Sequence, residues 1–177
     1  MRNLESVVDA ELKRRLDAAA VTYCLIGASA LAVHGYVRAT ADIDLLTLDD
    51  RVLAPDFWAG APVMIRRGDW DDPLAGTVVW TAAIQHDVIV GRGYAASFAL
   101  QSARENARLG CRVAEPLALA LLKLEAGSAQ DLYDVVALIQ QRTAIDGAPW
   151  AAAIAEHLPA LSKEARDAWV RMQSILK

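Results

Sequence analysis

Two segments decide how this chain folds, YCLIGASALAVHG at residues 23–35 and DIDLLTL at residues 42–48. The first is typical of a strand that ends at Gly27, followed by a short helix of small residues that stops at the next glycine. The second alternates from its first residue, so Asp42 and Asp44 project to one face of a strand and the apolar residues between them to the other. The segments therefore predict a strand, a tight turn, a short helix and a second strand with paired carboxylates.

Asp42 and Asp44 are candidate ligands for a divalent cation. Two carboxylates one residue apart repel each other unless they are solvated, protonated or bridged by a cation. Mg²⁺ suits this role, because it prefers oxygen ligands and is commonly held by one or two carboxylates together with substrate phosphates. Asp87 begins a second apolar strand that could lie beside residues 42–48, so it is the best candidate for a third carboxylate. Two ions held by the three residues could clamp an attacking and a leaving oxygen during turnover.

Gly27 adds a candidate phosphate site. A strand-to-helix turn without a side chain lets phosphate oxygens approach the backbone N–H groups at the start of a helix. The phosphate turn and the metal ligands would then face one cleft.

The remaining elements are predicted from apolar periodicity and turn residues. An amphipathic helix is expected over residues 4–20 and short strands over residues 63–65, 77–81 and 87–90, after which the sheet is expected to end. Beyond the sheet the pattern predicts one helix, a short extended piece and then helices only, at residues 95–109, 112–114, 116–126, 129–141, 150–157 and 162–175.

Composition limits the class of protein. The 177 residues suit one domain with a small helical annex, and no apolar run is long enough to span a membrane. The N-terminus lacks the apolar core and cleavage site of a signal peptide, so a cytoplasmic location is expected. Cys24 and Cys111 lie in separate predicted strands, where isolated cysteines usually act as small buried hydrophobes. The net charge of −4 argues against extensive contact with nucleic acid.

These residues resemble a known family. The run from Ile26 to Leu31, followed by His34-Gly35, Arg38, Thr40 and the run from Asp42 to Leu45, is similar to the signature of the DNA polymerase β-like nucleotidyltransferase superfamily. It most resembles the small prokaryotic branch related to AbiEii-type toxins and minimal nucleotidyltransferases. The resemblance extends over roughly residues 23–139, because the later segments agree in order, at residues 86–91, 115–117, 122–127, 130–132 and 134–135.

The resemblance implies an α+β fold of the nucleotidyltransferase type. It consists of a small mixed β-sheet flanked by helices and followed by a helical C-terminal part. Residues 1–110 are expected to form the nucleotidyltransferase core. Residues 111–177 are expected to form a helical extension that packs on the core, so that the chain is a single structural unit.

The resemblance also implies a reaction. Asp42 and Asp44 would bind Mg²⁺ together with a nucleoside triphosphate, and Asp87 would help to orient or deprotonate an acceptor hydroxyl. A nucleoside monophosphate would be transferred with loss of pyrophosphate, to an RNA end, a protein or a small molecule. The branch suggests a toxin–antitoxin or phage-defence system with a cognate toxin or antitoxin as partner. Residues expected to contact the nucleotide are Gly27, Ala28, Ser29, Arg38, Thr40 and Lys123.

Several of these residues also have structural interpretations. Arg38 could bind a triphosphate or pair with neighbouring acids, and Thr40 could cap or orient the loop before Asp42. Lys123 could extend along an apolar helix face into solvent or lie at the edge of the cleft. The sequence Ser128-Ala129-Gln130-Asp131 fits a capping box. Asp134 lies one turn further on the same face, where it could contact Lys123 or Arg38.

Two features keep other functions open. The family commonly has Gly-Gly or Gly-Ser at the turn, whereas this chain has Gly27-Ala28, and the extra methyl group suggests a module that binds nucleotide or a partner without transfer. Residues 91–96 match a dinucleotide-binding fingerprint after a strand, with Glu115 downstream. A dinucleotide fold needs further alternation of strands and helices, however, and helices alone are predicted beyond Glu115. The chain has no Walker A sequence.

Overall fold

A mixed sheet of seven strands forms the centre of the molecule. The computed structural model describes residues 7–70, 72–147 and 149–173. The strands lie in the order β3-β4-β5-β2-β1-β7-β6. Their bounds are β1 Tyr23–Leu25, β2 Asp42–Thr47, β3 Val63–Arg67, β4 Leu74–Trp80, β5 Gln85–Gly91, β6 Arg104–Asn106 and β7 Cys111–Val113.

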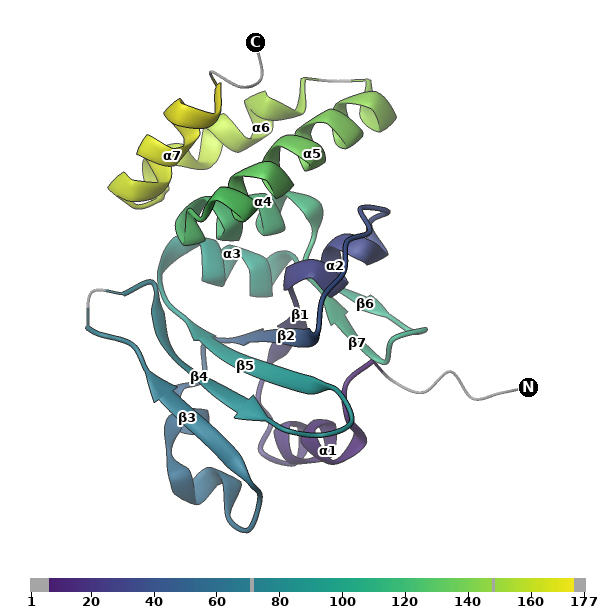
Figure 1. The fold of residues 1–177 in the computed structure, drawn as a ribbon, viewed down its shortest axis with the longest axis vertical. Helices are drawn as coiled ribbons and strands as arrows, with labels where there is room; N and C mark the ends of the chain where they lie inside the picture. Colours follow the sequence, from purple (N-terminus) through teal and green to yellow (C-terminus); the bar gives the residue numbers. More distant parts are fainter. Residues whose placement is uncertain (1–6, 71, 148, 174–177) are drawn as a thin grey trace.

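Helices cover both faces of this sheet (Figure 1). In that view α1 lies below the sheet, α3 and α4 lie above it, and α5, α6 and α7 form a further layer at the top. The helices are α1 Ala10–Ala18, α2 Gly27–Val33, α3 Gly93–Ser102, α4 Pro116–Ala126, α5 Ala129–Asp146, α6 Trp150–His157 and α7 Lys163–Gln173. Three short 3-10 helices occur at Asp50–Leu53, Pro55–Trp58 and Leu158–Ala160.

Local signals set several helix ends. The Asp9 side chain accepts hydrogen bonds from the N–H groups of Glu11 and Leu12, so α1 begins later than the expected residue 4. The first part of the expected helix, residues 1–6, lies outside the described residues. The predicted capping box of Ser128 and Asp131 is confirmed at the start of α5.

The pairing of β2 with β5 positions the acidic residues. These two strands run parallel, with Asp44 opposite Asp87 and Asp42 opposite Gln85. Residues directly opposite each other in neighbouring strands project to the same face of a sheet. The adjacency of the two strands, which was predicted, therefore places the carboxylates of Asp44 and Asp87 side by side.

The sequence pattern suggested that the sheet ends at β5, but the structure shows that it continues. The helix expected over residues 95–109 stops at Ser102. The segment that follows forms a hairpin of β6 and β7, and β7 pairs in parallel with β1. The cause is the turn between the two strands, where the Asn106 side chain accepts hydrogen bonds from the N–H groups of Arg108 and Leu109. The expected start of the helical extension at residue 111 falls inside this hairpin, and α4 is the first helix after the sheet.

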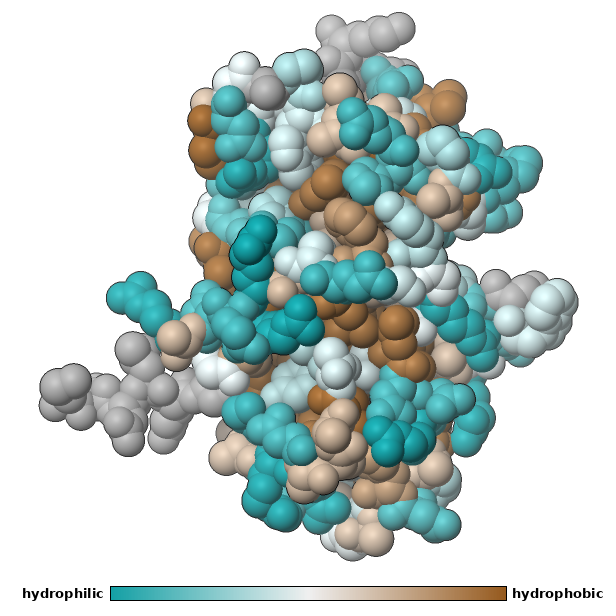
Figure 2. Space-filling model, turned by 180° about the vertical axis from the view of Figure 1, so that it is seen from behind, coloured by the Kyte–Doolittle hydropathy of each residue, from teal (hydrophilic) through white to brown (hydrophobic). Residues whose placement is uncertain are grey.

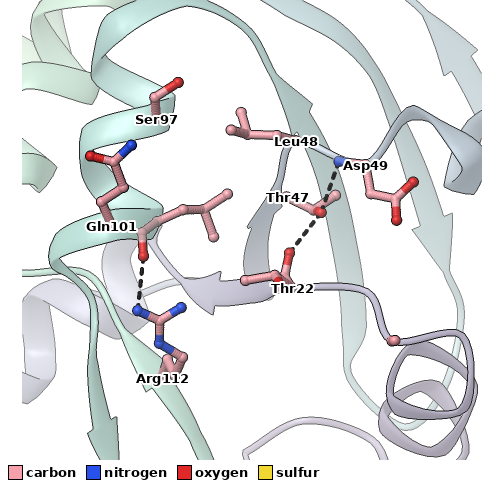
Figure 3. Close-up of a pocket in the computed structure, with 9 residues that line it drawn as sticks. Thr22, Thr47, Leu48, Asp49, Ser97, Gln101 and Arg112 are labelled. Atoms are coloured by element: carbon pink, nitrogen blue, oxygen red, sulfur yellow. Dashed lines mark hydrogen bonds between the residues drawn. The ribbon is translucent and has the colours of Figure 1, made fainter.

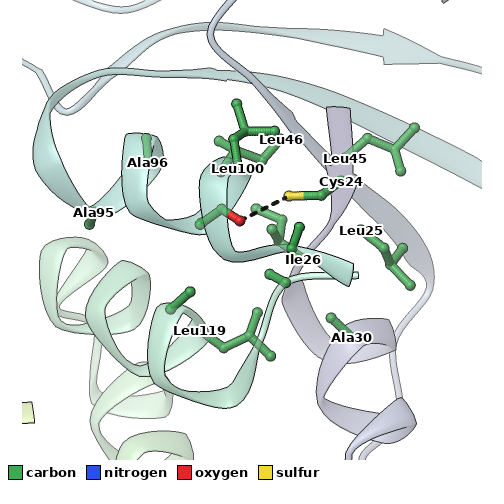
Figure 4. Packing of buried hydrophobic residues seen from close by; sticks show 14 of the residues in the cluster. Cys24, Leu25, Ile26, Ala30, Leu45, Leu46, Ala95, Ala96, Leu100 and Leu119 are labelled. Atoms are coloured by element: carbon green, nitrogen blue, oxygen red, sulfur yellow. Dashed lines mark hydrogen bonds between the residues drawn. The ribbon is translucent and has the colours of Figure 1, made fainter. Parts of the chain in front are cut away.

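Apolar side chains of β1, β2, α3 and α4 interdigitate above the sheet (Figure 4). Leu46 of β2 and Leu119 of α4 are almost completely buried there. Cys24 lies among them with its thiol directed toward a carbonyl of α3. Burial raises the pKa of this thiol to about 12. Cys24 and Cys111 are both buried and free, as predicted.

The surface is polar over most of the face opposite to that of Figure 1. Figure 2 shows hydrophilic residues above and below, with hydrophobic residues gathered across the middle of the molecule. Within the described residues, every helix is too short or too polar to cross a membrane.

Candidate metal and nucleotide site

Three carboxylates meet on the face of the sheet that α3 and α4 cover. One oxygen each of Asp42, Asp44 and Asp87 lies within 4.8 Å of the others, and all three residues are half-buried. Asp87 is the third residue of β5 rather than its first, so the neighbouring strands enclose it more than a strand end would allow. The structure thus brings together all three residues that the sequence singled out.

Neighbouring side chains orient two of these carboxylates. The Thr40 hydroxyl, which was expected to cap or orient the loop, donates to Asp42 Oδ1 at 2.7 Å. The Gln85 amide donates to Asp87 Oδ1 at 2.8 Å. Gln85 was missed at the sequence level, although it lies two residues before Asp87 and period two alone puts both on one face.

Asp44 is the most confined of the three. Burial, together with the negative charges of Asp42 and Asp87, raises the pKa of its carboxyl group from the ordinary 3.8 to about 6. The positive charges of Lys123 and Arg38 act in the opposite direction. A cation at this position would favour the ionised form, because it would offset the repulsion from the two other carboxylates.

Gly27 is required by the position of Asp44. A Cβ atom at residue 27 would lie 1.9 Å from Asp44 Oδ2, so the Asp44 side chain would have to move from its present position. The backbone there also has φ +64°, a conformation that favours glycine. Asp44 therefore packs directly on the turn at the start of α2. The lack of a side chain at Gly27 makes room for this contact, in addition to any room it would make for a phosphate.

The next two residues of the turn differ in exposure. Ala28 is buried, with only 2% of its surface exposed, and Ser29 is half-buried. The Ala28 methyl group therefore does not project into the open space beside the carboxylates. The backbone of this turn, rather than its side chains, remains the candidate phosphate contact.

A buried charge network lies next to the three carboxylates. Lys123 of α4 places its Nζ 2.6 Å from Asp134 Oδ2 and 2.9 Å from Asp131 Oδ1. Arg38 Nε, from the loop before β2, lies 3.3 Å from the same Asp134 oxygen. The structure thus brings Arg38 and Lys123 together through Asp134, as the structural interpretation of these residues suggested.

Asp134 is charged although no part of its side chain is exposed. Burial opposes its charge, but the hydrogen bond and positive charge of Lys123, with a hydrogen bond from Gln130, outweigh burial and hold the pKa of Asp134 below its usual range. Arg38 acts in the same direction. The network joins the helical C-terminal part to the loop that leads into β2.

The donor set of the three carboxylates fits a hard divalent cation. It contains oxygen atoms only, as Mg²⁺ prefers. Mg²⁺–oxygen distances of about 2.0–2.1 Å let one ion bridge oxygens up to about 4 Å apart. Two ions can serve a wider cluster, since they lie about 3.5–4 Å apart in such sites. Asp42, Asp44 and Asp87 could therefore hold one ion after a small contraction or two ions as they stand.

The dinucleotide fingerprint at residues 91–96 has a packing explanation. A Cβ atom at Gly91 would lie 2.6 Å from the Ala96 Cβ and 2.8 Å from Leu46 Cδ1, so the glycine lets α3 pack closely on β2. The segment after α3 is the β6–β7 hairpin, and helices alone follow β7 within the described residues. This topology lacks the strand and helix alternation that a dinucleotide fold needs.

A cavity of about 550 Å³ lies at the far end of β2 from the carboxylates (Figure 3). The hydroxyl of Thr47 donates to the Thr22 carbonyl and accepts from the N–H of Asp49. Arg112 donates to the carbonyls of Leu100 and Ala103. The Thr47 hydroxyl and the Arg112 guanidinium thus bond backbone groups of the protein itself.

The mixed sheet, with an acidic cluster beside a strand-turn-helix, defines a nucleotidyltransferase-like fold, as predicted. Among solved structures, the chain is similar to the solution structure of the antibiotic-resistance factor ANT(2'')-Ia, with a TM-score of 0.50 and 13% sequence identity. The match covers 94% of this chain and 89% of that one. At this identity the likeness concerns the fold alone. No family model matches the sequence, and no curated protein matches it either.

Asp134→Asn should destabilise the protein by about 3–5 kcal/mol, because it leaves Lys123 buried with one carboxylate fewer. The matched control is Asp146→Asn, which breaks a partly exposed pair with Arg142 on the same helix and should cost less than about 1 kcal/mol. Urea unfolding monitored by circular dichroism measures both. Equal losses in the two variants would contradict a stabilising role for the network.

Asp44→Asn should stabilise the metal-free protein at pH 7. The folded state binds the Asp44 proton more tightly than the unfolded chain, so the free energy of unfolding falls as pH rises from about 4 to about 6. Removing the charge should recover about 1–3 kcal/mol at pH 7 and almost nothing at pH 4. Urea unfolding in EDTA at both pH values tests this, with the exposed Asp56→Asn as control. A variant that is no more stable than the wild type at pH 7 would refute the assigned repulsion.

Proposed function

We propose that this protein is a Mg²⁺-dependent nucleotidyltransferase that transfers a nucleoside monophosphate from a nucleoside triphosphate to a hydroxyl acceptor. The observation that supports this most is the meeting of three carboxylate oxygens within 4.8 Å on one face of two parallel strands. The turn at Gly27 lies against one of them, so a triphosphate at this turn would reach the metal ligands.

In this mechanism Asp42, Asp44 and Asp87 hold the metal. Bound Mg²⁺ would supply positive charge to the phosphates and lower the cost of placing an anion beside three carboxylates. Thr40 and Gln85 keep two of the carboxylates oriented toward the site through their hydrogen bonds. Arg38 and Lys123 contribute positive charge near Asp44, where a triphosphate would lie.

The transfer forms a bond between the acceptor oxygen and the α-phosphorus and breaks the bond from that phosphorus to the bridging oxygen. Pyrophosphate leaves with the electron pair of the broken bond. Asp87, on the strand beside Asp44, orients the acceptor hydroxyl and accepts its proton, which then passes to solvent.

The alternative is a module that binds nucleotide or a partner without transfer. It was motivated by Ala28, but the buried methyl group of that residue gives no steric reason for inactivity. Both functions predict binding of nucleoside triphosphate with Mg²⁺ in calorimetry. Release of pyrophosphate in the presence of an acceptor separates them, because only the transferase forms it.

Wild-type protein incubated with each α-labelled nucleoside triphosphate, Mg²⁺ and cell extract should transfer label to an extract component and release pyrophosphate. Asp44→Asn should reduce both by about 10²–10³-fold, the usual loss when a group that stabilises developing charge is removed. Asp56→Asn, with its carboxylate on the exposed surface of a 3-10 helix, should transfer normally. Transfer that survives the combined Asp42→Asn and Asp44→Asn substitutions would refute the mechanism.

We also propose that this activity serves as the toxin of a toxin–antitoxin or phage-defence pair, as the resemblance to the AbiEii-type branch suggests. Induced expression of the wild-type chain in a bacterial host should then slow growth, and Asp44→Asn should restore it because transfer is lost. Colony counts after induction measure the effect. Equal growth inhibition by both chains would argue against toxicity through transfer.

A further inference from the structure

A cavity of about 640 Å³ continues along the sheet from the three carboxylates. Its floor includes Leu46 and Ile89, which follow Asp44 and Asp87 by two residues on the same strands. Residues two apart on a strand share a face and lie about 7 Å apart. The cavity therefore begins one side-chain step from the candidate metal site, on the same face and under α3 and α4.

The body of this cavity is apolar. Leu46 and Ile89 form the floor, and Ala95 and Leu122 approach from α3 and α4. Its volume lies within the range of about 300–1,000 Å³ that is usual for small-molecule sites. A space of this volume and lining suits a compact molecule with an apolar body.

The charged residues that line the cavity are three arginines and two acids, with a net charge of +1. Arg67 and Arg92 bond only neutral carbonyl groups, so their charges are not cancelled. Asp72 Oδ2 and Glu125 Oε1 each accept a hydrogen bond from a neutral backbone N–H, of Asp69 and Ser162 respectively, so both acids also keep their charge. The electrostatic balance thus favours an anion over a cation.

Arg66 is the lining cation that is available to a ligand. Its guanidinium has no hydrogen bond or ion pair within the part of the chain that the structure describes. Arg66 lies opposite Thr77 of β4, which in turn lies opposite Ile89 of β5. It therefore shares the face of Asp87 and lies two strands away, about 10 Å across the sheet.

We propose that this cavity receives the acceptor, and that the acceptor is a small molecule with an apolar body, an anionic group and a hydroxyl. The anionic group pairs with Arg66, the body packs on Ile89 and Leu122, and the hydroxyl reaches Asp87. This inference rests on the proposed transferase, in which the hydroxyl oxygen bonds the α-phosphorus, its proton leaves through Asp87 and pyrophosphate departs. A polycationic acceptor would meet a lining with a net charge of +1.

A matched pair of probes tests the charge preference without nucleotide or metal. 2-Naphthalenesulfonate and 2-naphthylmethylammonium share one apolar body and differ in the sign of charge. In EDTA the wild-type protein should bind the sulfonate at least about tenfold more tightly by calorimetry, since a hydrogen-bonded charged group contributes about that factor. Arg66→Gln should remove this preference. Arg108→Gln, an exposed arginine in the β6–β7 turn, should leave it unchanged.

Equal binding of the two probes, or a preference that survives Arg66→Gln, would overturn the inference. Arg66 is exposed on an edge strand, so Arg66→Gln is expected to fold, and circular dichroism verifies this.

Label transfer with fractionated small molecules separates this inference from the proposed function. The extract is divided by ion exchange into anionic, neutral and cationic fractions, and the anionic fraction should accept the label. Transfer to the cationic fraction alone would overturn the acceptor class and leave the transferase standing. Absence of transfer to every fraction, with the charge-selective binding intact, would instead overturn the transferase and leave a charge-selective cavity.

Discussion

The repulsion among Asp42, Asp44 and Asp87 is the constraint on which the rest of this structure depends. Three carboxylates within 4.8 Å destabilise any fold unless a cation or a proton offsets their charge. The protein nevertheless holds them there through the parallel pairing of β2 with β5 and through Gly27, the one residue type that lets Asp44 lie against the turn. The repulsion among these carboxylates lowers the stability of the folded protein, as is common at functional sites.

The C-terminal helices contribute to the same electrostatic balance. Lys123 of α4 and Arg38 of the loop before β2 converge on Asp134 of α5, and both cations also lower the pKa of Asp44. A buried pair of this kind adds little net stability, because desolvation of the charges opposes their attraction. The main effect of this network is to hold the helical part against the loop that leads into β2. The helical part therefore contributes to the electrostatic environment of Asp44.

The sequence predicted those parts of the fold that depend on local spacing. Period two placed Asp42 and Asp44 on one face, and the capping residues placed the start of α5. The β6–β7 hairpin escaped prediction, because its strands have three residues each and pair with distant β1. The position of Arg66 was not predicted for a related reason. Only the pairing of β3, β4 and β5 shows that Arg66 shares a face with Asp87. Contacts set by register between strands are not encoded in any local pattern.

The charge of this sheet face changes sign over a short distance. Acidic side chains occupy the end near Gly27, and arginines line the cavity that begins two residues further along β2 and β5. A triphosphate needs a cation before it can approach the acidic end, whereas an anionic molecule is attracted to the other end directly. The acidic end can thus hold an anionic ligand only together with a cation, whereas the arginine-lined end can hold one directly. Because both lie on one face under α3 and α4, molecules bound at the two ends would meet beside Asp87, where the strand changes from one environment to the other.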